Sequence, residues 1–419
     1  MRPPLGLLML VAVLTGPTGT AADELPLHGF VQGATGFRLA EPDGCPPTQR
    51  LACEERLLLG EGRLRLELTP RGERWGLTAK GELIADGIGQ DVTGELREAY
   101  LDLTFPALDL RLGRQIITWG VGDLLFITDV FPKDWVAFIS GLPLEYLKRG
   151  VDAVSATVHA WETSLQVVLI PRLEPDTVPA AGGRIRFDDP AAGLESRRTA
   201  DPPITAGNTQ VGLRLFRNVA GWDLSLYAYR GFFLSPAAAV EPGPRLRFFF
   251  PPLSVGGASA QGAALGGVVS LEGGYYDSRS DRSGRDPFVE NSSVRLLAGY
   301  QREVVPDLTL SGQYSVQLME DHGEFLRTRA PGLRKRPLTR HVLTLRATQL
   351  LLHQTLRLGL FILASPNEGD VYVNPEARYQ VTDALSATVG VNLFGGPRRT
   401  DYGQFAEDSS LYVAMRYAF

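Results

Sequence analysis

Histidine, cysteine and the short motifs of enzymes are scarce in this sequence, which excludes most catalytic and metal-binding classes. Only five histidines and two cysteines occur among 419 residues. No histidines have the spacing of a zinc site, and no H-E-x-x-H, G-x-S-x-G, phosphate-binding loop or C-x-x-C-H motif is present. His322, between acids in the stretch 320–324, is expected to be a solvated loop tip rather than a metal ligand or a base. We therefore predict no enzyme, no cofactor and no metal site.

Basic charge and long apolar runs are lacking as well. The net charge of −5 provides no basic surface of the kind that binds nucleic acid. After the N-terminal segment, no stretch reaches the roughly 18 consecutive apolar residues of a transmembrane helix. That segment has a positive start at Met1-Arg2, an apolar core at Leu7–Leu14 and small residues at 19–22, a pattern typical of a secretory signal peptide. We predict a signal peptide at 1–22 and one domain at 23–419.

The two cysteines lie close together in a proline-rich polar segment. Cys45 and Cys53 are eight residues apart, and no histidine cluster accompanies them to complete a metal site. A secreted protein enters an oxidising compartment, where such a pair most simply closes a small loop. We predict a disulfide between them.

Short segments of alternating apolar and polar residues make up most of the mature chain. In the last segment the apolar residues share one face, while Arg416 falls on the other; the apolar face comprises Leu411, Val413, Met415, Tyr417 and Phe419. Strands of a membrane barrel direct apolar residues to the lipid and polar residues to the lumen with this period of two. Because the chain stops on an aromatic residue, Phe419 is predicted to be an assembly signal for the barrel-assembly machinery.

Short turns and longer polar linkers alternate along the chain, as turns and external loops do in outer-membrane barrels. The pattern predicts an all-β, transmembrane antiparallel barrel of about 18 strands, or 16 if Arg245–Ala260, which contains Pro251-Pro252, is a loop. Strands begin near Leu27–Leu39, which leaves no room for a plug domain. A soluble sandwich array or propeller would need internal repeats, and none is evident.

One long linker, 120–150, is too apolar to extend into water. We predict that this external loop folds into the barrel, where its charges pair with the wall and it either narrows the lumen or only caps and stabilises the barrel. The residues assigned to this constriction are Arg114, Gln115, Trp119, Asp123, Asp129, Lys133, Asp134, Trp135, Glu145, Lys148 and Arg149.

Charged residues also recur at positions that strand parity directs into the lumen. The acids are Glu98, Asp102 and Asp109, and the cations are Arg111, Arg214, Arg295, Arg346, Arg378 and Arg416. They either set a transverse field across the pore or neutralise one another as a structural lining. Arg114 falls with the outward leucines, so either a bulge near Gly113 reverses the register or Arg114 lies at the polar rim.

The start of the long loop carries the most specific sequence pattern. It comprises Gly113-Arg114-Gln115, Trp119-Gly120, Gly122-Asp123, Thr128-Asp129 and Pro132-Lys133-Asp134. The pattern resembles a widespread set of proteobacterial outer-membrane barrels with a G-R-Q-x-x-x-W-G hallmark, a later acidic turn and an element ending in P-x-D. These barrels are similar in architecture to alginate-export and phosphate-selective porins. The resemblance covers about 40 residues and implies an integral outer-membrane barrel without naming its solute.

These observations together predict a channel in the outer membrane of a Gram-negative bacterium. It would transport small solutes passively through a lumen narrowed by the loop at 120–150. Two alternatives remain open at this point: a barrel that works with periplasmic export components to transfer lipids or hydrophobic compounds, and a structural barrel without transport. Outer-membrane lipid is the expected surrounding, and the oligomeric state is left open.

Overall fold

The computed structural model describes residues 27–40, 56–180, 183–185, 196–241, 245–329 and 334–419. The predicted signal peptide lies outside these ranges, as do Cys45 and Cys53, so the predicted disulfide falls outside the described part of the chain.

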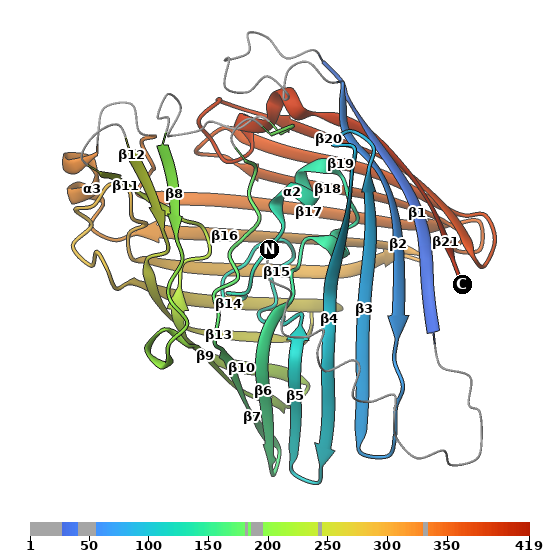
Figure 1. The fold of residues 1–419 in the computed structure, drawn as a ribbon, viewed down its shortest axis with the longest axis horizontal. Coiled ribbons are helices and arrows are strands. Elements are labelled where there is room, and N and C mark those ends of the chain that lie inside the picture. The colour runs from blue at the N-terminus through green and yellow to red at the C-terminus, as the bar shows by residue number, and fades with distance from the viewer. Residues whose placement is uncertain (1–26, 41–55, 181–182, 186–195, 242–244, 330–333) are drawn as a thin grey trace.

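The chain folds into a closed, 18-stranded antiparallel barrel, as the alternation predicted (Figure 1). Its strands are β1 (Leu27–Arg38), β2 (Leu57–Leu68), β3 (Trp75–Asp86), β4 (Asp91–Phe105), β5 (Leu108–Gln115), β6 (Val151–Ala160), β7 (Thr163–Ile170), β9 (Gln210–Val219), β10 (Trp222–Phe232), β13 (Pro252–Ala264), β14 (Gly267–Ser278), β15 (Ser293–Val305), β16 (Leu308–Met319), β17 (Thr339–Leu351), β18 (Leu356–Ser365), β19 (Asp370–Gln380), β20 (Leu385–Gly395) and β21 (Ser410–Ala418).

Pairing of the first and last strands closes the sheet, so that no barrel edge is left unpaired. The register runs from Phe30 opposite Ala418 to Arg38 opposite Ser410. Beyond it, the amides of Gly29 and Phe419 each donate to the other's carbonyl, at 2.9 and 3.0 Å. Phe419 is thus part of the closure. Its role as an assembly signal stays a prediction.

One end of the barrel has only short turns, and the other has the long connections together with the short turns 87–90 and 366–369; they are here named the turn end and the loop end. The turns at the turn end are 69–74, 106–107, 161–162, 220–221, 265–266, 306–307, 352–355 and 381–384. At the loop end, β8 (Ser196–Ala200), β11 (Ala237–Glu241) and β12 (Arg245–Phe249) form a separate three-stranded sheet (Figure 1). The segment Arg245–Ala260 is therefore divided: its first part belongs to this small sheet, and the barrel strand begins only at Pro252.

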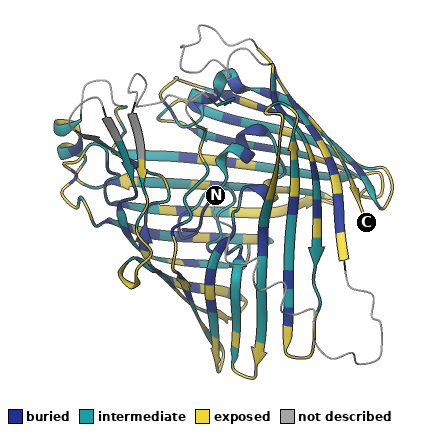
Figure 2. Cartoon of the chain, in the orientation of Figure 1, coloured by how far each residue is buried: buried dark blue, intermediate teal, exposed yellow. Residues whose placement is uncertain are grey.

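The outer face of the wall is apolar. Along β21, for example, Val413, Met415 and Tyr417 are exposed, while Tyr412 on the opposite face is buried. Figure 2 shows the same alternation of buried and exposed residues along other wall strands. This period of two directs apolar side chains outward and polar ones into the lumen. Within the described ranges, no helix is both long enough and apolar enough to cross a membrane.

A β-bulge lies beside the start of the long loop, but on β4 and not near Gly113, which was one of the two alternatives that the sequence left open for Arg114. The pairing of β5 with both neighbours is continuous through Gly113, so Arg114 stays on the outer face with Leu112. It lies at the loop end, 3.5 Å from Asp152 and 3.7 Å from Glu174, which corresponds to the rim alternative. The register shift occurs instead between β3 and β4, opposite Lys80 and Gly81.

This shift leaves Arg97 as an extra, unpaired residue on β4. Arg97 and the following residue, Glu98, are both buried. The side chain of Arg97 reaches the long loop, donating to the carbonyls of Glu145 at 2.8 Å and Lys148 at 3.4 Å. The bulge therefore adds a cation to the inner wall.

Candidate functional site

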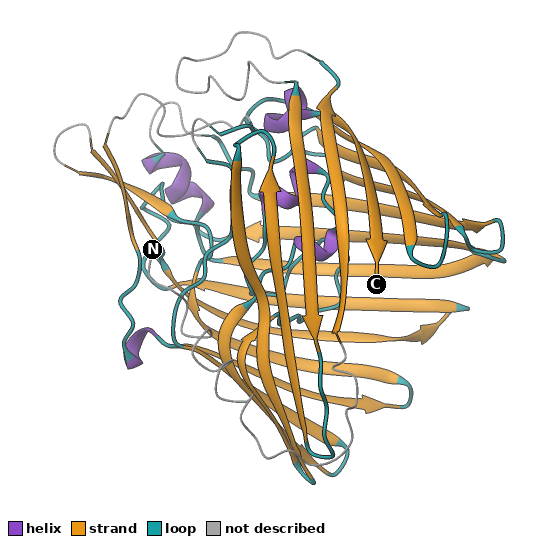
Figure 3. Ribbon diagram, turned by 45° about the vertical axis from the view of Figure 1, so that its right-hand side comes forward, coloured by secondary structure: helices purple, strands orange, loops and turns teal. Residues whose placement is uncertain are grey.

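The connection between β5 and β6, residues 116–150, lies within the ring of strands and is here called the inner loop (Figures 1 and 3). It contains helix α2 (Trp135–Ser140) and the 3-10 helix η3 (Leu144–Tyr146). Its hydrogen bonds reach wall strands on opposite sides of the barrel, from Gln166 of β7 and Glu272 of β14 to Arg416 of β21. The prediction that this loop folds into the barrel is thus confirmed.

One wall carboxylate, Glu272, organises the first part of the inner loop. It is buried, and its Oε2 accepts the amides of Val121 at 2.8 Å and Gly122 at 3.1 Å. Its Oε1 accepts both the amide and the hydroxyl of Thr128, at 2.7 and 2.6 Å. Backbone amides that converge in this way form an anion-binding nest. A buried carboxylate thereby has its charge satisfied, and the loop has its free amides satisfied.

The nest explains the glycine of the Trp-Gly motif. Gly120 has φ +79°, and a Cβ there would lie 2.5 Å from Oε1 of Glu272. Only glycine combines that backbone conformation with that close approach. The next glycine, Gly122, approaches the carbonyl of Leu125, to which a Cβ would come within 2.0 Å.

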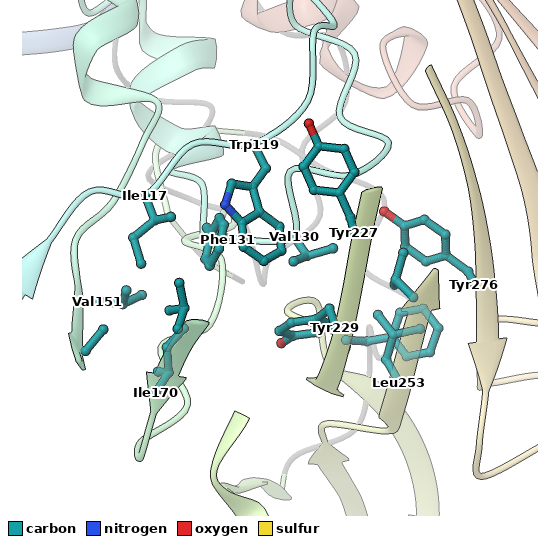
Figure 4. Close-up of a cluster of buried hydrophobic side chains, with 14 residues drawn as sticks. Ile117, Trp119, Val130, Phe131, Val151, Ile170, Tyr227, Tyr229, Leu253 and Tyr276 are labelled. Carbon is teal, nitrogen blue, oxygen red and sulfur yellow. The ribbon is translucent and has the colours of Figure 1, made fainter. Parts of the chain in front are cut away.

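Apolar packing holds the same part of the loop against β7, β10, β13 and β14. Trp119 lies between Phe131 and Tyr227, with ring centroids 5.0 and 5.5 Å apart (Figure 4). The wall has glycines where side chains of the loop approach it most closely. A Cβ on Gly212 would come within 2.7 Å of Trp119, and one on Gly257 within 2.6 Å of Thr128. Glycines that sequence reading assigns only to strands thus make room for the loop.

Asp123 attaches the loop to the opposite wall. Its carboxylate faces Arg346 of β17 in a bidentate pair whose Nη2–Oδ1 distance is 2.8 Å, and its amide donates to Gln313 of β16 at 2.8 Å. Two parallel bonds of this kind fix orientation as well as distance. The pairing of loop charge with lumen arginine that the sequence suggested is therefore present at this residue.

The charges in the middle of the inner loop pair mainly among themselves. Asp129 lies 3.1 Å from Lys133 and 3.4 Å from Lys148, and the first two side chains are almost fully buried. Burial lowers the pKa of Lys133, although Asp129 opposes this. Asp176, from the β7–β9 connection, accepts the Lys133 amide at 2.8 Å and the Trp135 indole N–H at 3.2 Å. Burial raises the pKa of Asp176.

Helix α2 carries the loop to the far side of the lumen. Asp134 caps it by accepting the Ala137 amide at 2.8 Å. Phe138 then packs on Tyr372 of β19, with ring centroids 5.0 Å apart, and Asn392 of β20 donates to the Ile139 carbonyl at 3.2 Å. The helix is thus fixed by a cap at its start and by the wall along its body.

The end of the loop is clamped by arginines. Glu145 lies 2.8 Å from Arg65 of β2 and 2.6 Å from Arg416 of β21. The next residue, Tyr146, is buried, with Arg63 4.1 Å and Arg97 4.7 Å from its ring centroid. Burial raises the pKa of Tyr146 to about 12, so its hydroxyl is neutral at physiological pH.

The remaining predicted residues occupy structural positions near the base of the loop. Gln115 is buried and donates to the Ala153 carbonyl at 3.0 Å. Lys148 also donates to Thr118 at 2.9 Å, and Arg149 to the Pro175 carbonyl at 3.2 Å. These contacts connect the loop to its own base and to the neighbouring β7–β9 connection.

The predicted lumen acids form local pairs within the wall. Glu98 lies 2.7 Å from Lys80, and Asp102 lies 2.6 Å from Arg111. Asp109 is 2.9 Å from His159, which in turn is 2.8 Å from Ser164. The local pairing favours the structural alternative for these acids over a field across the pore.

Cavities remain on both sides of the inner loop. The turn-end chamber has a volume of about 440 Å³ and is lined by Arg346, Arg357, Arg378 and Arg416 against only two acids, Glu145 and Glu376. The loop-end chamber, of about 1090 Å³, extends from α2 to the external connections. The inner loop thus separates a turn-end chamber rich in arginine from a larger loop-end chamber with a mixed polar and apolar lining, rather than filling the barrel.

Several residues that determine this arrangement were missed by sequence reasoning. Glu272, Arg65, Arg97 and Asp176 contact the loop directly, and Arg357 lines the turn-end chamber. Strand parity does assign Glu272 to the lumen face, opposite Leu271. Strand parity gives no sign, however, that amides of the inner loop converge on this carboxylate.

We predict that Glu272→Gln lowers the free energy of unfolding by about 3 kcal/mol, because an amide nitrogen then faces buried amide donors. Urea unfolding of the detergent-solubilised barrel measures this loss, and faster proteolysis within 120–131 should accompany it. Glu303→Gln is the matched control, because Glu303 lies exposed near the end of β15 and accepts a single amide, that of Asp307 at 2.9 Å. Equal stability of the Glu272→Gln variant and the wild type would contradict the assignment of Glu272 as the main anchor.

A second prediction concerns pH. Burial disfavours the charged form of Glu145, but Arg416 and Arg65 outweigh it and lower the pKa of this carboxyl. A carboxyl with a lowered pKa stabilises the fold at neutral pH, and this contribution is lost as the pH falls below about 4. The difference in unfolding midpoint between wild type and Glu145→Gln should therefore be constant from pH 7 to 5 and shrink at lower pH. A difference that grows on acidification would refute this.

Comparison with known proteins identifies the fold but no close relative. No protein-family model matches the chain, and no curated protein matches its sequence. The structure of Pseudomonas aeruginosa OccK2 (OpdF), a complex with glucuronate, is similar with 10% identity and a TM-score of 0.58, over 94% of this chain and 97% of that one. Acinetobacter baumannii OccAB3 is similar with 8% identity and a TM-score of 0.54, over 94% and 98%. The chain therefore has the fold of a porin-type barrel.

Proposed function

We propose that the protein is an outer-membrane channel for the passive transport of small solutes. The observation that carries this proposal is the inner loop, which is attached to opposite walls by Glu272 and by Glu145 while leaving a chamber on each side. A fixed loop of this kind narrows an aqueous lumen without closing it.

The location follows from the wall. A closed antiparallel barrel satisfies all its backbone hydrogen bonds internally, so that it tolerates lipid on an apolar outer face. Such a face is present, and barrels of this type reside in the outer membrane. The porin-type fold supports the same location.

The turn-end chamber supports a preference for anions. Arg357 has no ion-pair partner among the described residues, and the adjacent Arg378 donates only to the Ser386 hydroxyl, at 3.3 Å. Cations without a carboxylate partner raise the local concentration of anions. Glucuronate, which is bound in the structure of OccK2, is likewise an anion.

Planar-bilayer recordings test the channel itself. We expect stable single-channel steps from the purified protein, and a larger conductance when Leu124–Glu145 is replaced by a short Gly-Ser linker, because the constriction is then removed. Heat-modifiable migration on gels confirms that each barrel is folded. A folded wild type that gives no conductance would refute the channel proposal and favour the export or structural alternatives.

Ion selectivity tests the role of the arginines. In a tenfold KCl gradient, the double variant Arg357→Gln/Arg378→Gln should lower the ratio of chloride to potassium permeability about threefold, since two lumen cations are lost. Arg217→Gln/Arg302→Gln removes two exposed cations from the outer face and is the matched control. An identical reversal potential in both double variants would refute the anion preference.

A further inference from the structure

The loop-end chamber has a largely apolar floor and far wall. Helix α2 contributes Trp135, Phe138 and Ile139, and Phe394 and Phe405 line the same cavity. Its volume of about 1090 Å³ is sufficient for a small organic molecule together with water. A lining of aromatic and aliphatic side chains of this kind suits the apolar part of an organic molecule better than a bare ion.

Most charges that line this chamber are already paired. Arg334 and Arg340 share the carboxylates of Glu368 and Asp401. Arg295 lies 2.7 Å from Glu290. These residues therefore offer little free charge to a ligand.

The acid Asp176 is also engaged. Its two oxygens accept the Lys133 amide and the Trp135 indole N–H. This carboxylate is thus a poor site for a cationic ligand.

Arg336 differs from the other cations of the chamber. Its guanidinium lies 4.6 Å from the ring centroid of Phe325, and no carboxylate pairs with it within the described part of the chain. Burial lowers the pKa of Arg336, although Glu290 opposes this. A partly desolvated cation beside an apolar wall attracts an anion more strongly than one in open water.

We propose that the loop-end chamber binds an amphipathic organic anion, with its carboxylate on Arg336 and its aromatic or short aliphatic body against the apolar wall of α2 and Phe405. The inference rests on the proposed function, because the bound anion is a solute held above the constriction before it passes. It adds the chemical class of solute, which the turn-end arginines alone do not specify.

Isothermal titration of the solubilised wild type with 3-phenylpropionate tests the site. Propionate has the charge without the ring, and 3-phenyl-1-propanol has the ring without the charge. We expect 3-phenylpropionate to bind at least about tenfold more tightly than either, since both parts of the site are then used. Equal affinity for the acid and the alcohol, or no binding of the acid, would overturn the proposal.

Substitutions assign the effect to Arg336. Arg336→Gln should weaken 3-phenylpropionate binding about tenfold and leave 3-phenyl-1-propanol unchanged, while Arg336→Lys restores part of the loss. Lys335→Gln removes the neighbouring cation, which does not line this chamber, and should have no effect. Equal loss in Arg336→Gln and Lys335→Gln would overturn the site, since only nonspecific charge would then matter. Heat-modifiable migration confirms that each variant is folded.

Conductance separates this inference from the proposed function. If the wild type conducts but 3-phenylpropionate neither binds nor reduces the current, the binding site is wrong and the channel stands. If 3-phenylpropionate binds in an Arg336-dependent manner but no current flows, the channel is wrong and the binding site stands.

Discussion

A buried carboxylate on the barrel wall, Glu272, is the interaction on which the inner loop depends. Burial of a charge is costly unless hydrogen bonds replace its water, and here the loop supplies the amides of Val121, Gly122 and Thr128. The same bonds satisfy loop amides that have no strand partner. The carboxylate and the loop amides therefore offset each other's desolvation cost. The close approach of the loop to this carboxylate explains why residue 120 is glycine.

The charged side chains of the lumen fall into two groups with different consequences. Those with carboxylate partners, such as Arg346 with Asp123 or Arg65 with Glu145, hold the loop in place. Those without such a partner in the described ranges include Arg357 and Arg378 in the turn-end chamber and Arg336 in the loop-end chamber. Because a paired charge is largely neutralised by its partner, the anion preference that we propose rests mainly on the second group.

Much of the architecture was readable from the chain alone. The period of two along the strands predicted the barrel, the succession of short and long linkers predicted its strand number, and the apolar content of 120–150 predicted the inward fold of that loop. The errors are local and have physical causes. Arg245–Phe249 has a strand pattern but pairs with other loop strands, and the sequence did not reveal the bulge at Arg97 of β4, because a register shift depends on the partner strand.

The sequence by itself determined that the chain forms a membrane barrel with an apolar outside, because strand parity is a local property that the solvent on each face enforces. Only the tertiary structure decided how the loop is held. Thr128 and Glu272 are 144 residues apart, Asp123 and Arg346 are 223 apart, and Glu145 and Arg416 are 271 apart. Closure of the barrel brings these residues together, and neither spacing nor composition encodes which acid meets which cation across the lumen. The partners of the inner loop, and the cations left for a solute, are therefore properties of the closed barrel.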